Sequence, residues 1–291
     1  MSTRRAPGWF GRAGRSIAGL ALAGMVSGGG LALVMRYRNP YRPVLERISF
    51  RLPVGHEALA GLRIGFITDT HLNPYFSRKD LERGLSLLAA EAPDLLLLGG
   101  DYISEATRYI DEAAPPLGQL ARATPLGALA VLGNHDLGGH GQAVIDGLKA
   151  EGIRVLRNEA VAVPWNGDEL WVAGTDDDLL GKPLPSLAFA AVPTGAAVLS
   201  LWHEPDSADR AVAFQPFAQL SGHSHGGQIR LPRIGEMAVP VGGRKYPVGH
   251  YDVDGMQLYT SRGLGTYRPP VRFRCQPEVT LVTLVAADPA T

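Results

Sequence analysis

The chain has 291 residues, of which 45% are hydrophobic and 19% are charged, a composition typical of a globular protein with a sizeable core. Lys plus Arg and Asp plus Glu both total 28, so there is no basic excess and we expect no nucleic-acid binding. Cys275 is the single cysteine, which excludes an internal disulfide and a cysteine-based zinc site.

Residues 16–35 are expected to form a single-pass N-terminal membrane anchor. These 20 residues carry no charge, and arginines flank them on both sides. A helix of this length extends ~30 Å, about the thickness of a bilayer core. Because the arginines are balanced across the run, the side of the membrane on which the rest of the chain lies stays open.

A cleaved signal peptide is the main alternative to an anchor, because five glycines and two serines make the run weakly hydrophobic. Against cleavage, the run is long for a signal peptide and no clear A-x-A site closes it. The pair Arg4-Arg5 also allows a twin-arginine signal, although the residues that follow fit that pattern poorly. We therefore expect a protein of the cell membrane, with an exported form if the N-terminus is removed.

The next part of the chain alternates apolar strands with helices. Residues 62–71 predict a buried strand that runs into a polar turn, and residues 93–101 and 126–136 repeat this pattern. Helices are predicted between these strands, one after the N-cap residue Ser77 and one over roughly 105–122. This alternation predicts βαβ units and a parallel sheet.

The second half of the chain is richer in strands. Residues 160–177 alternate and turn at Asn166-Gly167, which predicts a β-hairpin. Apolar runs at 196–205 and 217–220 each break into a polar turn, and MQLYTSRGLG and EVTLVTLVA predict two further strands. No repeat or low-complexity linker interrupts this region. One two-layered domain is therefore expected over residues 44–291, with residues 1–43 forming the basic N-terminus, the anchor or signal, and a linker.

Five of the predicted strands end in side chains that bind metals: Asp69-Thr70-His71, Gly100-Asp101, Gly133-Asn134-His135-Asp136, His203-Glu204 and His223-Ser224-His225. Each group alone is typical of a turn or a helix cap, but together they contain five of the eight histidines. The C-terminal ends of strands are where open α/β sheets bind ligands. Nitrogen and oxygen donors without sulfur favour Mn²⁺, Fe or Zn²⁺, and an aspartate can bridge two ions. A two-metal hydrolytic site is therefore predicted.

In their order, D-x-H, G-D, G-N-H-D, H-E and G-H-x-H, these motifs resemble the calcineurin-like metallophosphoesterase superfamily over about residues 60–285. The stretches SGHSHGGQIRLP and SRGLGTYRPPVRF further resemble its bacterial membrane-associated phosphodiesterase branch. The resemblance implies an α/β fold, a two-layered β-sandwich of mixed sheets flanked by helices. It also implies one metal ion on Asp69, His71 and His225, a second on Asn134, His203 and His223, and Asp101 as the bridge between them.

The resemblance implies that His135 is not a ligand but a general acid or an electrostatic stabiliser for the leaving oxygen. The expected reaction is hydrolysis of phosphomonoesters or phosphodiesters by a metal-bridging hydroxide, with the phosphodiesterase activity favoured. The predicted anchor motivates a lipid-linked or nucleotide-sugar lipid substrate. The alternatives are a metallohydrolase for another ester class and a catalytically silent metal-binding scaffold, although His135 beside every expected ligand argues against the scaffold.

One departure from the superfamily narrows the expected activity. Protein phosphatases of the superfamily read G-D-x-x-D-R-G, whereas Ser104 stands here at the position of the second aspartate. In those phosphatases the aspartate orients the histidine equivalent to His135, so the orientation of His135 stays open here. We therefore do not expect protein phosphatase activity. Four residues near the motifs are further candidates for contact with the phosphate or leaving group: Tyr102, His140, Arg230 and Arg244.

Overall fold

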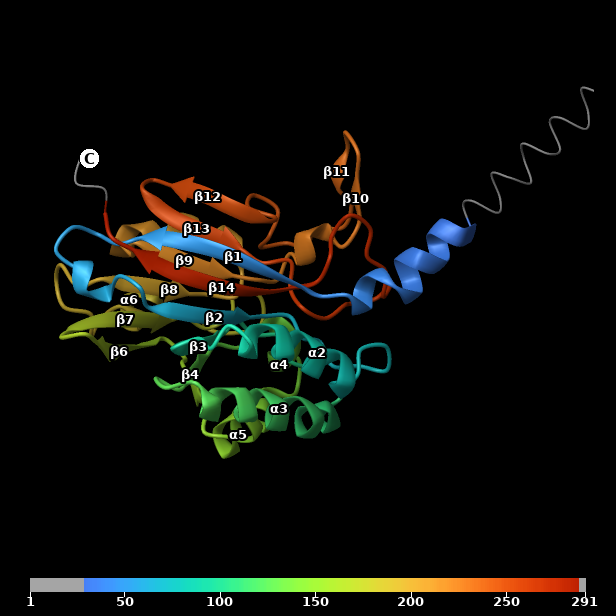
Figure 1. Cartoon of the computed structure of the whole chain (residues 1–291), viewed down its shortest axis with the longest axis horizontal. Coiled ribbons are helices and arrows are strands. Elements are labelled where there is room, and N and C mark those ends of the chain that lie inside the picture. The colour runs from blue at the N-terminus through green and yellow to red at the C-terminus, as the bar shows by residue number, and fades with distance from the viewer. Residues whose placement is uncertain (1–28, 288–291) are drawn as a thin grey trace, which may run out of the picture.

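The computed structural model describes residues 29–287 and contains two six-stranded sheets packed face to face, with helices on the outside of the first (Figure 1). This confirms the predicted two-layered sandwich of mixed sheets. The helices are α2 (Arg78–Ala89), α3 (Ile110–Ala123), α4 (Asn134–Leu137), α5 (Gly141–Ala150), α6 (Pro185–Ala188) and α7 (Ala208–Ala211).

The first sheet contains the predicted βαβ units and gains a strand from the C-terminal end of the domain. Its order is β1 (Val44–Arg51), β14 (Glu278–Val285), β2 (Arg63–Ile67), β3 (Leu95–Leu98), β4 (Ala128–Ala130) and β5 (Arg154–Val155). Strands β2 to β5 are parallel, as the strand–helix alternation predicts. Strand β14 lies between β1 and β2, parallel to the first and antiparallel to the second.

The second sheet is built from the strand-rich half of the chain. Its order is β12 (Gly249–Val253), β13 (Met256–Thr260), β9 (Ala218–Ser221), β8 (Val198–Leu201), β7 (Asp168–Gly174) and β6 (Glu159–Trp165). The predicted hairpin is confirmed, since β6 and β7 are antiparallel across a turn in which Asn166 and Gly167 both have positive φ. A separate small hairpin consists of β10 (Arg230–Leu231) and β11 (Gly235–Glu236).

Strand β3 is apolar at every position because both of its faces are buried. Its residues Leu95 and Leu97 belong to the core between the two sheets, whereas Leu96 and Leu98 belong to the core under α2, α3 and α5. Successive side chains of a strand point to opposite faces, so a strand covered on both faces needs an apolar residue at every position. The same two layers of packing hold the C-terminal ends of the central strands in place.

Two sequence features fix the start of helix α2. The helix begins directly after Ser77, and the Asp80 carboxylate accepts a hydrogen bond of 3.1 Å from the Ser77 backbone N–H. This satisfies a donor that the first turn leaves unpaired and confirms the predicted N-terminus of the helix.

Gly84 allows helix α2 to pack closely against the loop that precedes β14, because a Cβ at this position would lie 2.5 Å from the Leu264 side chain in that loop.

The N-terminal part of the described chain lies against the folded domain. Residues 29–37 are helical and are followed by a 3-10 turn at Asn39–Tyr41. The Met35 carbonyl accepts a hydrogen bond of 3.0 Å from the Arg272 backbone N–H, and the Asn39 side chain donates to the Arg272 carbonyl at 2.9 Å. No helix within residues 29–287 has the length and hydropathy needed to cross a membrane. Most of the predicted anchor at 16–35 lies outside the described residues.

Candidate metal centre

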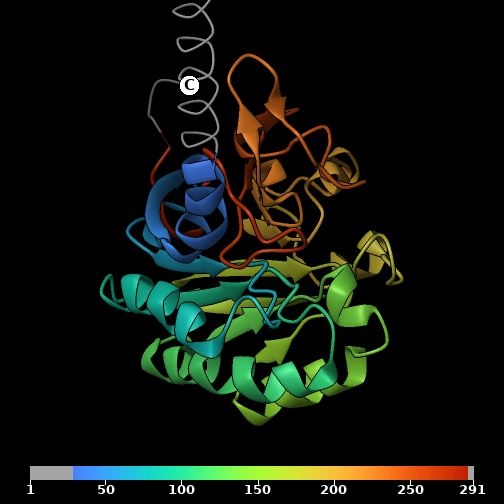
Figure 2. The same cartoon turned by 90° about the vertical axis from the view of Figure 1, so that its right-hand side faces the viewer.

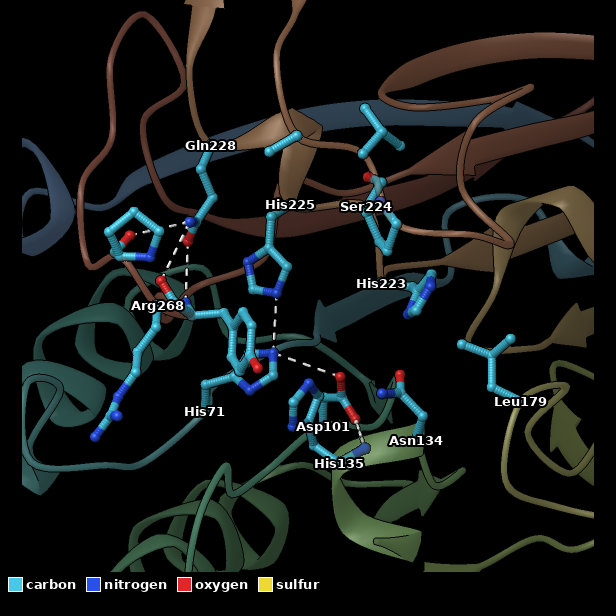
Figure 3. A pocket seen from close by; sticks show the side chains of 15 residues that line it. His71, Asp101, Asn134, His135, Leu179, His223, Ser224, His225, Gln228 and Arg268 are labelled. Carbon is cyan, nitrogen blue, oxygen red and sulfur yellow. Dashed lines mark hydrogen bonds and ion pairs between the residues drawn. The ribbon is translucent and has the colours of Figure 1, made fainter.

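Five loops at the C-terminal ends of strands meet at one edge of the sandwich. Strands β2, β3 and β4 of the first sheet and β8 and β9 of the second each lead into one of the polar groups predicted from the sequence. Figure 3 shows His71, Asp101, Asn134, His223 and His225 around a single hollow, drawn from both sheets. The sandwich therefore brings together side chains that lie up to 156 positions apart, from Asp69 to His225.

The backbone at these loops is unusual. Asp69, His71, Asp101, His223 and His225 all have positive φ, with values between 44° and 65°. Residues other than glycine adopt this left-handed conformation rarely, because the Cβ is crowded by the backbone, and in folded proteins such strain concentrates at functional sites. The surrounding sheets hold the strained turns, and four of these residues, His71, Asp101, His223 and His225, line the hollow.

The first group of potential ligands, the first triad, consists of Asp69, His71 and His225, all of them buried. The Nε2 atoms of His71 and His225 lie 2.9 Å apart. The Asp69 Oδ1 atom lies 3.4 Å from Nε2 of His225 and 3.8 Å from Nε2 of His71. Three donor atoms thus converge within the space that one metal ion takes.

The second group, the second triad, consists of Asp101, His203 and His223 and is also buried. Asp101 faces both groups, because its Oδ2 atom lies 3.2 Å from Nε2 of His203 and 3.4 Å from Nε2 of His71. The Asn134 Oδ1 atom and the His203 Nε2 atom are buried and make no hydrogen bond within the described part of the chain. Buried polar atoms without partners are costly unless a ligand satisfies them, so these two atoms fit a bound cation.

The charge states of the site also suit metal binding. Burial lowers the pKa of His71 to about 3 and that of His223 to about 4, and burial likewise holds the pKa of His225 well below its usual range. These imidazoles are therefore neutral near pH 7, which is the form that binds a metal. Burial alone would raise the pKa of Asp101, but the adjacent His203 outweighs it and keeps the carboxylate ionised.

Hydrogen bonds from outside the triads select which ring nitrogen faces the hollow. The Gly99 carbonyl binds Nδ1 of His203 at 2.7 Å, and the Val241 carbonyl binds Nε2 of His223 at 2.8 Å. A carbonyl only accepts, so the nitrogen it contacts carries the proton. Nδ1 of His223 thereby keeps a free lone pair for a cation. Burial lowers the pKa of His203, but the Asp101 carboxylate outweighs it and raises that pKa well above its usual value, so a cation at Nε2 of His203 would displace a proton.

Ser104 has a role that the sequence did not reveal. Its Oγ atom lies 2.7 Å from Nδ1 of His71, which leaves Nε2 of His71 for the first triad. The position that holds an orienting aspartate in protein phosphatases is therefore occupied here by a residue that orients a potential ligand. His135 is held differently, by ring contacts with His71 at 4.8 Å and with Tyr267 at 4.7 Å between centroids.

His135 lies beside the triads, and one of its ring nitrogens lies within 4.8 Å of donor atoms of His71 and Asp101, so its position alone would also allow it to bind a metal. It is partly exposed and lines the hollow, and its backbone N–H donates a hydrogen bond of 2.8 Å to Oδ1 of Asp101. The neighbouring Asp136 carboxylate accepts hydrogen bonds from the backbone of Asp101 and Tyr102 at 2.7 and 2.8 Å. These contacts tie the loop after β3 to the loop after β4.

The hollow has a volume of about 410 Å³ and continues from the triads along an apolar wall. Besides six of the predicted site residues, its lining contains Leu179, Ser224, Gln228, Ala238, Val239, Pro240, Tyr267, Arg268 and Pro269. Sequence reasoning missed Tyr267 and Arg268, although both stand in the stretch SRGLGTYRPPVRF that carries the family resemblance.

The four additional candidates for phosphate contact do not line the hollow. Tyr102 is fully buried and its hydroxyl donates to the Val131 carbonyl, so it supports the site from below. His140 hydrogen-bonds to Thr107, and Arg230 pairs with Glu236. Arg244 is exposed, and its guanidinium contacts the Val239 carbonyl. Proximity in sequence to the motifs was therefore a poor guide to position.

Comparison with known proteins identifies the family. Residues 62–227, which include every predicted ligand, match the Metallophos family of calcineurin-like phosphoesterases. The chain belongs to the calcineurin-like phosphoesterase family. It is 34% identical over 272 residues to the metallophosphoesterase YkuE of Bacillus subtilis (strain 168), covering 92% of this chain and 94% of YkuE.

Two further relatives of this calcineurin-like phosphoesterase carry more specific names. Phosphodiesterase YaeI of Escherichia coli (strain K12) is 33% identical over 245 residues, covering 82% of this chain and 88% of YaeI. The UDP-2,3-diacylglucosamine pyrophosphatase LpxG of Chlamydia trachomatis is 25% identical over 291 residues, covering 82% of this chain and 88% of LpxG. The calcineurin-like phosphoesterase described here is a metal-dependent hydrolase of phosphoesters.

Proposed function

We propose that this phosphoesterase is a phosphodiesterase that uses two divalent metal ions. The observation that supports two ions is the position of Asp101, whose Oδ2 atom lies within 3.4 Å of an imidazole from each triad. The first triad would hold one ion, and His203, His223 and Asn134 would hold the other, with Asp101 shared. The mixed nitrogen and oxygen donors favour Mn²⁺, Fe or Zn²⁺.

Metal ions bound by such donors polarise phosphoryl oxygens and lower the pKa of bound water. The remaining chemistry falls to side chains of the hollow. The partly exposed His135 imidazole faces the same space as the triads, so it is placed to donate a proton to the leaving oxygen. Contact with the ring of Tyr267 restricts the orientation of His135, while the guanidinium of Arg268 pairs with the Glu105 carboxylate at 2.8 Å.

The substrate is proposed to be a phosphodiester that carries a lipid or a nucleotide-sugar lipid. Leu179, Val239, Pro240 and Pro269 form an apolar wall beside the triads, and such a wall suits an acyl or prenyl group better than a sugar alone. The names of YaeI, a phosphodiesterase, and of LpxG, a pyrophosphatase of a diacylated sugar nucleotide, support the same class.

A hydrolysis assay tests the catalytic proposal. With Mn²⁺ and an aryl phosphodiester, the Asp101→Asn and His203→Ala variants are expected to lose activity by at least about 100-fold. His140→Ala is the matched control, because His140 hydrogen-bonds to Thr107 outside the hollow and its loss should leave the rate unchanged. Wild-type protein that is inactive on monoesters and diesters with every metal tried would contradict the proposal and favour a metal-binding scaffold.

We further propose that residues 16–35 anchor the enzyme to the cell membrane. The uncharged run of 20 residues supports this, with arginines on both sides of it. Membrane fractionation should place the full-length chain in the membrane pellet, and protease protection should show on which side the hydrolase domain lies. A full-length chain of unshortened mass in the soluble fraction would overturn the anchor.

A further inference from the structure

An apolar surface projects beside the mouth of the metal hollow. The β10–β11 hairpin and the segment after it expose Ile234, Met237 and Val241, with 70%, 52% and 58% of their surfaces accessible. The same segment continues into the apolar wall of the hollow through Val239 and Pro240. Single exposed apolar residues are ordinary, but a group of them at the entrance of a binding site marks a surface for interaction.

Positive charge accompanies this apolar group. Arg230, Arg233 and Arg274 line a second hollow of about 440 Å³ at the base of the hairpin. Arg230 pairs with Glu236 at 2.9 Å, whereas Arg233 and Arg274 are exposed and form no ion pair with any residue between 29 and 287. Exposed apolar side chains with arginines beside them are complementary to an anionic membrane, whose headgroups lie just outside an apolar layer.

The N-terminal helix and the hairpin are held to one another through a common segment. The backbone N–H of Arg230 donates to the Phe273 carbonyl, and the backbone N–H of Arg272 donates to the Met35 carbonyl, both at 3.0 Å. Figure 2 shows the helix of residues 29–37 and the hairpin in the same upper half of the molecule, and Figure 1 shows the hairpin pointing up and the helix to the right. Residues 29–35 of this helix are the last part of the uncharged run, and their side chains Leu31, Leu33 and Val34 are exposed.

We propose that the hairpin surface, formed by Arg233, Ile234, Met237, Val241 and Arg274, docks onto an anionic lipid bilayer. Docking in this orientation places the mouth of the metal hollow at the level of the lipid headgroups. Docking itself does not depend on the proposed phosphodiesterase function. Its consequence, that the substrate is taken from the membrane surface, does rest on that function. Tyr267, which lines the hollow and is exposed at its mouth, suits the interface between lipid and water.

The test measures the environment of the hairpin tip in the full-length protein. Ile234→Cys is labelled with a polarity-sensitive fluorophore, which is feasible because the native Cys275 is only 1% exposed. The labelled chain is reconstituted in phosphatidylcholine vesicles with or without phosphatidylglycerol and with brominated acyl chains as quenchers. Val54→Cys is the control, because Val54 is 77% exposed in the loop that follows β1, at the end of that strand away from the N-terminal helix.

The fluorescence emission of the label at position 234 is expected to shift to shorter wavelength and to be quenched by brominated lipid. Both effects should be stronger when phosphatidylglycerol is present. The label at position 54 should stay in water in both vesicles. Equal signals at the two positions would overturn the proposal. Shielding of position 234 that depends on protein concentration and not on lipid would identify self-association instead and would also overturn it.

A second measurement separates this proposal from the proposed function. The double variant Ile234→Ser/Met237→Ser should hydrolyse a soluble aryl phosphodiester at the wild-type rate, because neither side chain lines the metal hollow. Its rate on a phosphodiester lipid embedded in vesicles should fall several-fold, and an unchanged rate would count against docking. If the wild type hydrolyses no ester, the phosphodiesterase function fails while the fluorescence result still decides whether the surface docks.

Discussion

Ser104→Ala removes a single hydroxyl and should weaken metal binding without unfolding the protein. The Oγ atom of Ser104 lies 2.7 Å from Nδ1 of the buried His71. Without this partner the ring loses a contact that fixes its orientation, and Nε2 is held less firmly toward the first triad. Loss of such an orienting contact typically costs 10–100-fold in metal affinity, which corresponds to roughly 1.4–2.7 kcal/mol.

The global stability should change much less than the metal affinity. Ser104 is partly exposed, so water can replace the hydroxyl, and the free energy of unfolding of the metal-free protein should fall by about 1 kcal/mol or less. Ser86→Ala is the matched control, because its hydroxyl makes a hydrogen bond of the same length, 2.7 Å, to the Glu82 carbonyl on the exposed face of α2.

Metal affinity is measured by isothermal titration with Mn²⁺ and Zn²⁺ on the metal-free wild type and both variants. Urea unfolding of the same samples separates metal binding from stability. We expect weaker metal binding for Ser104→Ala but not for Ser86→Ala. Ser104→Thr keeps the hydroxyl and should restore part of the metal affinity. An affinity for Ser104→Ala within about twofold of wild type would show that the hydroxyl does not orient His71.

Three further predictions concern stability and metal binding. A hydrogen bond with the Gly195 carbonyl and the nearby Asp168 carboxylate raise the pKa of His56, so its contribution to stability is complete below about pH 6.5 and is lost as pH rises through the raised pKa. His56→Gln should therefore lower the free energy of unfolding by up to about 1 kcal/mol at about pH 5.5 and by less at about pH 8.5, measured by urea unfolding at both pH values. Arg272→Met removes the donor of hydrogen bonds to four loop carbonyl groups, those of Arg262, Gly263, Gly265 and Cys275, and should cost roughly 3–5 kcal/mol in chemical denaturation. A change below about 1 kcal/mol would contradict a structural role for this guanidinium. Gly222→Ala places a Cβ inside the contact distance of the Asp69 carboxylate, so calorimetric titration should show weaker metal binding, and unaltered binding would mean that the loop can move aside.

The residue types of the candidate site and their positions at strand ends could be read from the sequence, because both depend on local pattern. Asp69, Asp101 and His203 each follow a run of apolar residues, and the C-terminal ends of parallel strands in one sheet lie at the same edge. The predicted strands, the helix start at Ser77 and the hairpin at Asn166-Gly167 were confirmed for the same reason, since each depends on a few neighbouring residues.

The partners of individual side chains were not predictable in this way. Ser104 was interpreted from the position it shares with an aspartate in related enzymes, yet it contacts His71 and not His135. Nothing in the local sequence indicates that Arg272 is fully buried and that its guanidinium donates to loop carbonyl groups. A contact between side chains distant in sequence cannot be read from the residues next to either one. Many polar residues of suitable length would fit the same local sequence equally well.

The sequence by itself determined which strands form and which metal-binding side chains follow them, because both properties are local. Only the tertiary structure decided that β14 lies between β1 and β2 and that the loop before it carries Tyr267 and Arg268 to the hollow. It also decided that the hairpin of residues 230–236 and the N-terminal helix are tied to one segment beside the mouth of that hollow. These arrangements depend on the order of strands in the sheet, which is set by burial of apolar surface over the whole chain and not by any one stretch of it.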